Sequence, residues 1–320
     1  MRAVMIAEAG GPEVLKQVER PDPDLPPNHI RIRVHAVGVN RADVLQRRGL
    51  YPAPPGVAQD IPGLEYAGEV AECGAGATRF KVGAPVMGLV GGAAYAEQVV
   101  VHEREAIRVP TGFDIADAAA IPEVYLTAFD GLTQLRVRAG ERVLIHAIGS
   151  GVGTAALQLV RWMGAVSVGT SRTESKLTRA LELGLDEAVH VTDAGDFASR
   201  LSAPVHATLD LVGGAYFGES LKCLDSQGRH LIVGLTAGVS SELSLGLMLR
   251  KRLMVKGTNL RSRPLEEKIE LARRFETQVA GALGDGLKPI VDRVLPMDQV
   301  ADAHRALEAN ETFGKIILRW

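Results

Sequence analysis

The sequence has few cysteines and no excess of either charge. Only Cys73 and Cys223 occur in 320 residues, which excludes a disulfide framework and a multi-cysteine zinc lobe and predicts two buried thiols in a reducing compartment. The 36 basic and 38 acidic residues leave a formal charge of −2, so no overall field attracts nucleic acid or a membrane. The length predicts two domains, and with 46 % hydrophobic residues the chain can bury a large core.

The sequence also lacks a visible targeting or membrane-spanning segment. The first apolar run, residues 3–7, is too short for the apolar region of a signal peptide. Residues 143–160 carry no charge over a length that could span a bilayer, but they include His146 and three glycines. A buried strand, a turn and a helix explain this stretch better. We therefore expect a soluble, cytoplasmic protein that does not enter a membrane.

Short strands are predicted in the first third of the chain. Residues 29–37 alternate polar and apolar side chains with the period of a half-buried strand. Similar short runs at 67–73, 85–90 and 97–101 are separated by glycine and proline, which predicts a compact, barrel-like domain. The loop at 46–62 carries Tyr51 among four prolines.

From about residue 120, strands and helices alternate. A continuous apolar strand at 142–147 precedes a glycine-rich turn and a helix at 154–163. Further strands are predicted at 166–170, 188–191, 208–212, 230–235 and 253–258, with helices at 173–183 and 216–224. This alternation is typical of an α/β fold with a doubly wound parallel sheet covered on both faces.

The C-terminal part returns to a different pattern. It predicts a helix that begins at Pro264, a strand at 290–295, a helix at 298–309 and a strand at 315–319. Asp298 is the expected N-cap of the last helix, because its side chain can accept from the free N–H groups there.

The glycine-rich turn predicts a dinucleotide site. The pattern Gly149-x-Gly151-x-Gly153 follows a buried strand and precedes a helix, a position where free N–H groups and the helix dipole favour a pyrophosphate. The small residues allow close approach of backbone and ligand, so Ser150, Gly151 and Val152 are the expected contacts. A plain tight turn is the alternative, because the pattern is not the complete fingerprint.

The end of the second predicted strand favours NADPH over NADH. An NAD site usually has an acidic residue there, whereas this chain has Ser171 and Arg172, followed by Lys176 one helical turn later. Two cations and a hydroxyl suit a 2′-phosphate. A solvated cationic face is the alternative.

Several further motifs carry a family resemblance. They are residues 38–43, 48–51, 54–56, 63–68, 121–128, 146–153, 234–235, 260–263 and 314–316. In this order along nearly the whole chain, they resemble the medium-chain dehydrogenase/reductase superfamily, most closely its zinc-free quinone oxidoreductase branch, the zeta-crystallin-like enzymes. The resemblance implies a GroES-like β-rich catalytic domain over 1–122 and 264–320 and a Rossmann NADPH-binding domain over 123–263.

The zinc ligands of the superfamily are missing. Zinc enzymes of this superfamily have a cysteine after the Gly-x-Asn stretch and a histidine in a Gly-His-Glu motif. This chain has no cysteine near Asn40, and Leu64 stands where the histidine would be. Leucine cannot bind a metal, and the eight histidines are scattered without ligand spacing. No metal is expected, so reduction of an electron-poor acceptor fits better than alcohol dehydrogenation.

The resemblance also implies catalytic roles. Tyr51 looks like the hydrogen-bond donor to the acceptor carbonyl, with simple loop packing as the alternative. Asn40 resembles the family residue beside the nicotinamide ribose, and an ordinary turn residue is the alternative. The other implied cofactor contacts are Thr127, Gly234, Leu235, Leu260 and Lys315. Family members commonly have a tyrosine near the adenosine phosphate where this chain has Val191, so NADPH binding should depend more on Arg172 and Lys176.

Together these features predict an NADPH-dependent quinone reductase that transfers hydride without a metal. A reductase of enones or enoyl thioesters would use the same machinery and stays open. A non-enzymatic crystallin or RNA-binding role is a further alternative, against which the near-neutral charge and the lack of basic stretches interleaved with aromatics argue.

A homodimer is also expected. The strand at 253–258 is too apolar for a bare sheet edge, and the resemblance implies that it pairs with the same strand of a second copy. Alternatively, Lys251, Arg252 and Lys256 protect the edge of a monomer.

Overall fold

The chain divides into two compact units in the structure, a computed structural model that describes residues 1–320. The first, the β-rich unit, comprises residues 1–126 and 260–320, and the second, the parallel-sheet unit, comprises residues 127–259. The domain boundaries expected from the sequence, at 122/123 and 263/264, lie a few residues away from these. Each unit is described by itself.

Seven strands of the β-rich unit form one sheet. Their order is β14-β15-β3-β4-β5-β7, and β6 pairs with β3. The bounds are β3 (His29–Val39), β4 (Glu65–Cys73), β5 (Pro85–Leu89), β6 (Gln98–His102), β7 (Ile107–Arg108), β14 (Val291–Pro296) and β15 (Lys315–Arg319). A separate antiparallel pair is formed by β1 (Arg2–Ile6) and β2 (Leu15–Glu19). The helices are α1 (Arg41–Arg47), α7 (Leu265–Gln278) and α8 (Val300–Glu308), while α2 (Pro122–Gln134) crosses the boundary between the units.

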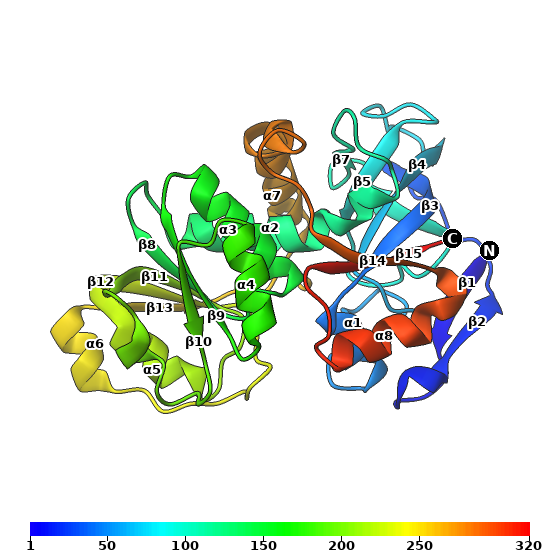
Figure 1. Cartoon of the computed structure of the whole chain (residues 1–320). Coiled ribbons are helices and arrows are strands. Elements are labelled where there is room, and N and C mark those ends of the chain that lie inside the picture. The colour runs from blue at the N-terminus through cyan, green and yellow to red at the C-terminus, as the bar shows by residue number, and fades with distance from the viewer. The chain divides into compact units, whose positions relative to one another are not determined.

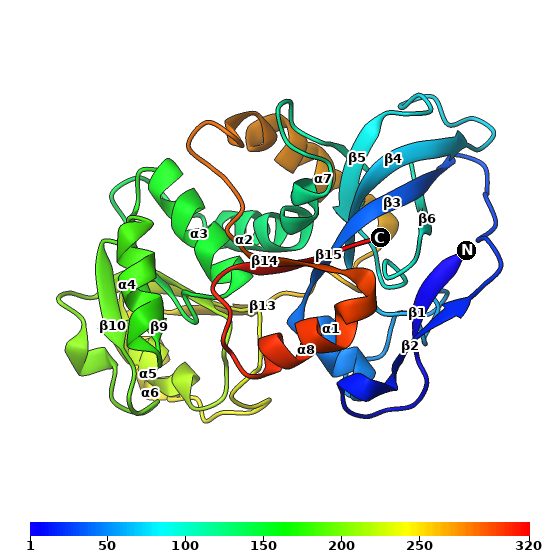
Figure 2. The same cartoon turned by 45° about the vertical axis from the view of Figure 1, so that its right-hand side comes forward.

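The longest strand of this unit, β3, holds the sheet together. It pairs antiparallel with β4, β6 and β15, so the last strand of the chain lies beside its first long strand (Figure 2). The predicted alternation is present, because Ile30, Ile32 and Val34 are buried while Arg33 is exposed.

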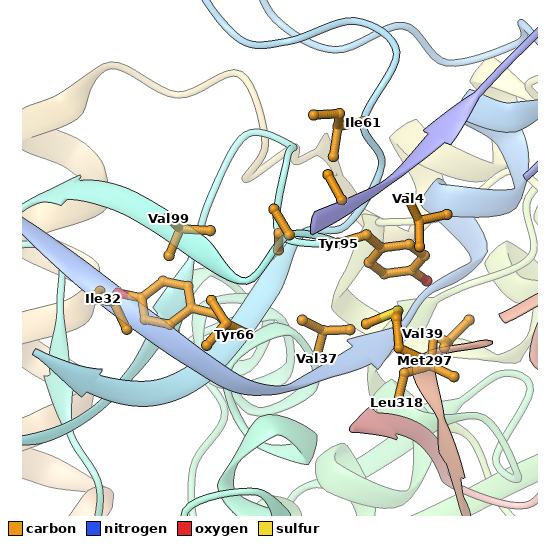
Figure 3. Packing of buried hydrophobic residues seen from close by; sticks show 14 of the residues in the cluster. Val4, Ile32, Val37, Val39, Ile61, Tyr66, Tyr95, Val99, Met297 and Leu318 are labelled. Carbon is orange, nitrogen blue, oxygen red and sulfur yellow. The ribbon is translucent and has the colours of Figure 1, made fainter. Parts of the chain in front are cut away.

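Apolar side chains from both ends of the sequence form the core of the β-rich unit. Figure 3 shows Val39 of β3 close to Met297 and Leu318 from the C-terminal segment, and Tyr66 and Val99 further along the strand. This shared core explains why the C-terminal segment belongs to the N-terminal unit.

The parallel-sheet unit confirms the predicted α/β organisation. Its six strands are parallel, in the order β10-β9-β8-β11-β12-β13 (Figure 1). The bounds are β8 (Arg142–Ile145), β9 (Val166–Ser171), β10 (Glu187–His190), β11 (Val205–Asp210), β12 (Leu224–Ile232) and β13 (Met254–Gly257). The strand order reverses beside β8, as in a doubly wound sheet.

Four helices connect these strands. They are α3 (Gly151–Trp162), α4 (Glu174–Glu182), α5 (Tyr216–Cys223) and α6 (Leu245–Lys251). Because crossovers between parallel strands are right-handed, α3 and α4 cover one face of the sheet and α5 and α6 the other. None of the helices in the chain combines the length and the apolar character needed to cross a membrane.

The predicted start of the last helix was wrong. A 3-10 turn at Met297–Gln299 comes first, and α8 begins at Val300 with Gln299, not Asp298, as its N-cap. The cause is the buried side chain of Met297. The chain makes a tight turn to bring this side chain into the core before α8 can start.

Other strand ends also differ from the prediction. The expected strand at 208–212 stops at Asp210, because the Asp210 carboxylate accepts from the N–H groups of Val212 and Gly213, each at 2.8 Å, and turns the chain. Helix α3 begins at Gly151 and not at residue 154. The short helix α6 and the β1–β2 pair were not predicted.

Candidate active site

Polar side chains meet where β3 ends and α1 begins. β15 pairs with β3 so that Ile316 faces Val39, and extending this register places Lys315 opposite Asn40. β4 pairs with β3 so that Ala67 faces Ala36, and extending this register places Glu65 opposite Gly38. Two antiparallel neighbours of β3 thus bring a cation and an anion to the same end of the strand.

Lys315 and Glu65 hold the side chain of Asn40 between them. The Lys315 ammonium donates to Glu65 Oε1 at 2.6 Å, to Asn40 Oδ1 at 2.7 Å and to the Val39 carbonyl at 3.0 Å. Asn40 Nδ2 donates to the same Glu65 oxygen at 2.9 Å. A Cβ on Gly38 would lie 2.1 Å from Glu65 Oε1, so only glycine leaves room for this carboxylate. The structure therefore places Lys315, expected among the cofactor contacts, where it fixes the orientation of Asn40.

Asp43 holds the backbone at the start of α1. Its carboxylate accepts from the Asn40 N–H at 2.8 Å, from the Gly63 N–H at 3.1 Å and from the Tyr95 hydroxyl at 3.2 Å. Burial raises the pKa of the Asp43 carboxyl to about 6, although the hydrogen bond from Asn40 favours the charged form. One buried acid thus joins the start of α1 to the backbone at Gly63 and to the side chain of Tyr95.

A chain of buried side chains continues from Asp43 to the surface. Tyr95 donates to Asp43 and lies 3.2 Å from His304 Nε2, and Arg47 approaches His304 Nδ1 at 3.3 Å. Because a guanidinium can only donate, Nδ1 accepts and Nε2 carries the proton toward Tyr95. Burial, followed by the nearby Arg47 charge, lowers the pKa of His304 to about 3, so the ring stays neutral. Arg47 also pairs with the partly exposed Glu308 at 2.7 Å. His304 therefore links buried side chains as a neutral ring.

Tyr51 lies half-buried in the loop that follows α1. The guanidinium carbon of Arg261 is 4.8 Å from the centre of its ring, and Arg261 Nη1 donates to the Tyr51 carbonyl at 3.0 Å. Sequence reasoning missed both Arg261 and Glu65 as residues of this region. The only signal was that each lies in a run, 260–263 or 63–68, that carried the family resemblance.

The glycine-rich turn of the parallel-sheet unit connects β8 to α3. Ser150 is the N-cap of α3, and its hydroxyl accepts from the Gly153 N–H at 3.0 Å. The N–H groups of Gly151 and Val152, at the first two helix positions, have no helical carbonyl to pair with. A Cβ on Gly153 would lie 2.5 Å from the Ala147 carbonyl, which explains the glycine.

A cationic residue stands at the end of β9. Arg172 is exposed, and Lys176 is half-buried on the first turns of α4. The Ser171 hydroxyl already donates to the Thr173 carbonyl at 3.1 Å and accepts from its N–H at 3.0 Å. Glu174, an acid that the sequence analysis left out, lies 3.2 Å from His190 Nδ1. The surface at this strand end therefore combines two cations with one carboxylate beside a histidine ring.

Val191 is a core residue of the parallel-sheet unit. Its side chain is buried in the main hydrophobic cluster, and its N–H donates to the Ser171 carbonyl at 2.9 Å. It therefore offers no polar group beside Arg172.

The remaining expected cofactor contacts are divided between the units. Thr127 is buried on α2 and Leu235 is half-exposed after β12, both in the parallel-sheet unit. A Cβ on Gly234 would lie 2.5 Å from the Leu211 carbonyl, so the chain passes close to β11 there. Leu260 is half-buried and belongs to the β-rich unit.

No group of three or more histidine, cysteine, aspartate or glutamate side chains is placed to hold a metal ion. Leu64, at the position of the family histidine, is 6 % exposed. A cavity of about 540 Å³ opens in the β-rich unit beside His29, His102 and Lys268, and none of the expected site residues lines it. The candidate site is thus defined by its hydrogen-bonded side chains and not by this cavity.

Comparison with known proteins identifies the family. Residues 26–111 match the model of the alcohol dehydrogenase GroES-like domain, and residues 183–318 match a model described as zinc-binding dehydrogenase. The human quinone oxidoreductase is 30 % identical over 329 residues, which cover 99 % of this chain and 97 % of that protein.

Solved structures share the whole architecture. A quinone oxidoreductase from Thermus thermophilus, described with its NADPH complex, is 30 % identical with a TM-score of 0.84, and the match covers both chains completely. An NAD-dependent alcohol dehydrogenase is 31 % identical with a TM-score of 0.86, again over both complete chains. These likenesses confirm the GroES-like domain and the Rossmann-type sheet expected from the sequence. The chain therefore belongs to the quinone oxidoreductase branch of the medium-chain dehydrogenase/reductase superfamily, and it is an oxidoreductase.

Proposed function

We propose that this oxidoreductase transfers a hydride from NADPH to a quinone or a similar electron-poor acceptor without using a metal. The observation that carries the proposal is the contact between Lys315 and Glu65. The Lys315 ammonium, 2.6 Å from the Glu65 carboxylate, already balances the acid that binds the side chain of Asn40. The neighbouring Leu64 offers no ligand, so this region lacks the donors that a Lewis-acid metal needs.

The glycine-rich turn fits the pyrophosphate of a dinucleotide. Two unpaired N–H groups, those of Gly151 and Val152, stand at the positive end of α3, and Ser150 stabilises the turn that presents them. Gly234 also stays a proposed contact, although packing alone accounts for this glycine, because a side chain there would collide with Leu211. When bound, the cofactor supplies the hydride, and the protein binds and orients it. Thr127, Leu235 and Leu260 remain proposed contacts.

We assign the 2′-phosphate of NADPH to Arg172 and Lys176. Arg172 is exposed at the end of β9, where an NAD-specific site would have a carboxylate. Ser171 contributes less than expected, because its hydroxyl is engaged with Thr173. Glu174, 3.2 Å from His190 Nδ1, opposes the phosphate because it places a negative charge on the same surface. The NADPH complex described for the Thermus relative favours the same choice.

Tyr51 is the proposed donor to the acceptor. Hydride addition to a quinone leaves negative charge on a carbonyl oxygen, and a positioned phenol stabilises that charge with one hydrogen bond. A proton from water then completes the hydroquinone. Asn40, whose side chain is fixed by Lys315 and Glu65, is the proposed contact to the nicotinamide ribose.

We also propose that two copies pair through β13. This strand is the last of the parallel sheet, and Met254 on it is 47 % exposed. Two of the three cations that could shield the edge are engaged elsewhere. Lys251 donates to the carbonyls of Lys222 and Leu224, and Arg252 donates to Ser226.

The proposed function is tested by following NADPH and NADH oxidation with 9,10-phenanthrenequinone, a simple enone and a crotonyl thioester. We expect turnover to be highest with NADPH and the quinone and to survive dialysis against EDTA. A higher kcat/KM for the thioester would assign the enoyl-reductase alternative. Loss of turnover on EDTA treatment with recovery on zinc addition would refute the metal-free mechanism.

The role of Tyr51 is tested with Tyr51→Phe, which keeps the ring and removes the donor. Loss of one preorganised donor costs about 2.7–4 kcal/mol at a strongly charged transition state, and less for an easily reduced quinone. We therefore expect a lower kcat/KM for the quinone and nearly unchanged NADPH binding. An unchanged kcat/KM would make Tyr51 a packing residue.

A further inference from the structure

Arg261 is a buried cation that has no carboxylate partner. It is 7 % exposed, and its three hydrogen bonds all go to neutral oxygens. Nε donates to the Gly91 carbonyl at 2.7 Å, Nη1 to the Tyr51 carbonyl at 3.0 Å and Nη2 to Gln46 Oε1. Burying a charge that no carboxylate contacts is unfavourable: burial lowers the pKa of Arg261, and the more distant charge of Asp43 offsets this only in part. A residue kept at such a cost calls for a role beyond stability.

The same guanidinium holds Tyr51 at two points. It binds the backbone carbonyl of Tyr51 and stacks on the ring of that residue, with 4.8 Å between the guanidinium carbon and the ring centre. Arginine is suited to this because its planar group can stack and donate at the same time. With backbone and ring both fixed, the direction of the Tyr51 C–O bond is fixed as well.

Arg261 is also connected to the rest of the loop after α1. Gln46, which accepts from Arg261, donates to the Gln59 carbonyl at 3.0 Å. The Gln59 side chain in turn donates to the carbonyls of Ala53, Pro54 and Val57 at 3.0 to 3.2 Å. No helix or strand lies between α1 and β4, so these side-chain contacts replace regular backbone pairing. The geometry makes Arg261 the one charged anchor of this network.

We propose that Arg261 is the positioning residue of Tyr51: it fixes the ring so that the phenol points at the acceptor when the hydride arrives. This inference rests on the proposed donor role of Tyr51. Hydrogen-bond donors lower a barrier most when they are oriented before the reaction. The positive charge at the ring face also draws electron density from the phenol, which strengthens its O–H as a donor.

A double-mutant cycle on kcat/KM tests this. Arg261→Met removes the charge and the donors, and Arg261→Lys keeps the charge but loses the planar group. We expect each to lower kcat/KM for the quinone, Arg261→Met by about tenfold or more, because small misplacements of a reacting group are costly. In the Tyr51→Phe background the same changes should have an effect below about twofold, since the donor is already gone. Arg104→Met is the matched control, because Arg104 is an exposed arginine of the same unit that pairs with Glu266. It should leave kcat/KM unchanged in the parent and in the Tyr51→Phe background.

Equal effects of the Arg261 variants with and without the Tyr51 hydroxyl would overturn the proposal. Hydrogen exchange of the peptide covering residues 50–59 gives a second readout that does not depend on turnover. We expect faster exchange in both Arg261 variants and no change in Arg104→Met. Unchanged exchange would overturn the positioning role even if activity falls. If instead no acceptor is reduced, or Tyr51→Phe is fully active, the proposed function fails, while the exchange result still decides whether Arg261 holds the loop.

Discussion

Removing either charge of the buried Lys315–Glu65 pair is expected to destabilise the β-rich unit, and the two losses should not add. Both side chains are buried, at 3 % and 0 % exposure. Lys315→Met leaves the Glu65 carboxylate with only two donors, the Asn40 amide at 2.9 Å and the Glu123 N–H at 2.8 Å. Glu65→Gln keeps an oxygen for Lys315 and Asn40, but its amide nitrogen would face the Glu123 N–H.

The magnitudes follow from these contacts. Leaving one charge of a buried pair alone costs about 3–5 kcal/mol, which we expect for Lys315→Met. By the same reasoning, Glu65→Gln leaves the Lys315 ammonium without its counter-charge and also leaves a donor facing a donor, so it should cost about 3–5 kcal/mol as well. The double variant leaves neither charge of this pair. It should therefore be no less stable than either single variant, with a coupling energy of about 3 kcal/mol or more.

The assay needs a probe that reports on the β-rich unit alone. The chain has two tryptophans, Trp162 on α3 and Trp320 at the end of the β-rich unit, so a Trp162→Phe background leaves Trp320 fluorescence as that probe. Urea titrations of the four variants in this background give the free energy of unfolding by linear extrapolation. The exposed pair Arg104–Glu266, at 48 % and 71 % exposure, is the matched control cycle and should couple by less than about 1 kcal/mol. Strictly additive losses at Lys315 and Glu65 would refute the reasoning.

Three further predictions follow from other parts of the structure. The pKa of Asp43 is raised to about 6, so ionisation of this acid should cost about 3 kcal/mol of stability as the pH rises from about 4 to above 6. Asp43→Asn should remove this loss. If the stability of the parent chain and that of the variant depend on pH in the same way, Asp43 does not cause the loss. Arg172→Ala should weaken NADPH binding at least about tenfold and leave NADH unchanged, whereas Arg179→Ala, from the last turn of α4, should affect neither in calorimetry. In light scattering the chain should have twice its 34.1 kDa mass. Leu249→Glu changes an 81 % exposed leucine of α6 near the sheet edge and should yield monomers, while the control Leu181→Glu should not. A monomeric parent chain would refute the proposed dimer.

Local patterns in the sequence account for most of the fold that was predicted. The alternation in β3 and the strand–helix succession after residue 140 depend on neighbouring residues, so they are readable without tertiary contacts. The helix start at Ser150 was misplaced by three residues, because the glycines that follow it look like a turn and yet form the first helical turn. Asp298 looked like an N-cap by residue type, but the buried Met297 decided where α8 begins.

Lys315 illustrates why the rest of the site could not be predicted in the same way. In the sequence it is a lysine beside a glycine, next to a short apolar strand, and residue type alone would put its charge in water. Its burial depends on the register of β15 against β3, a pairing between residues more than 270 positions apart. The register in turn requires Gly314, which has φ of +92° and where a Cβ would lie 2.2 Å from the Ile290 carbonyl. Glu65 reaches the same point only because Gly38 has no side chain. The contact that orients Asn40 thus depends on two glycines and two strand registers, none of which a single local pattern encodes. For that reason the cycle at Lys315 and Glu65 tests the fold and the candidate site together.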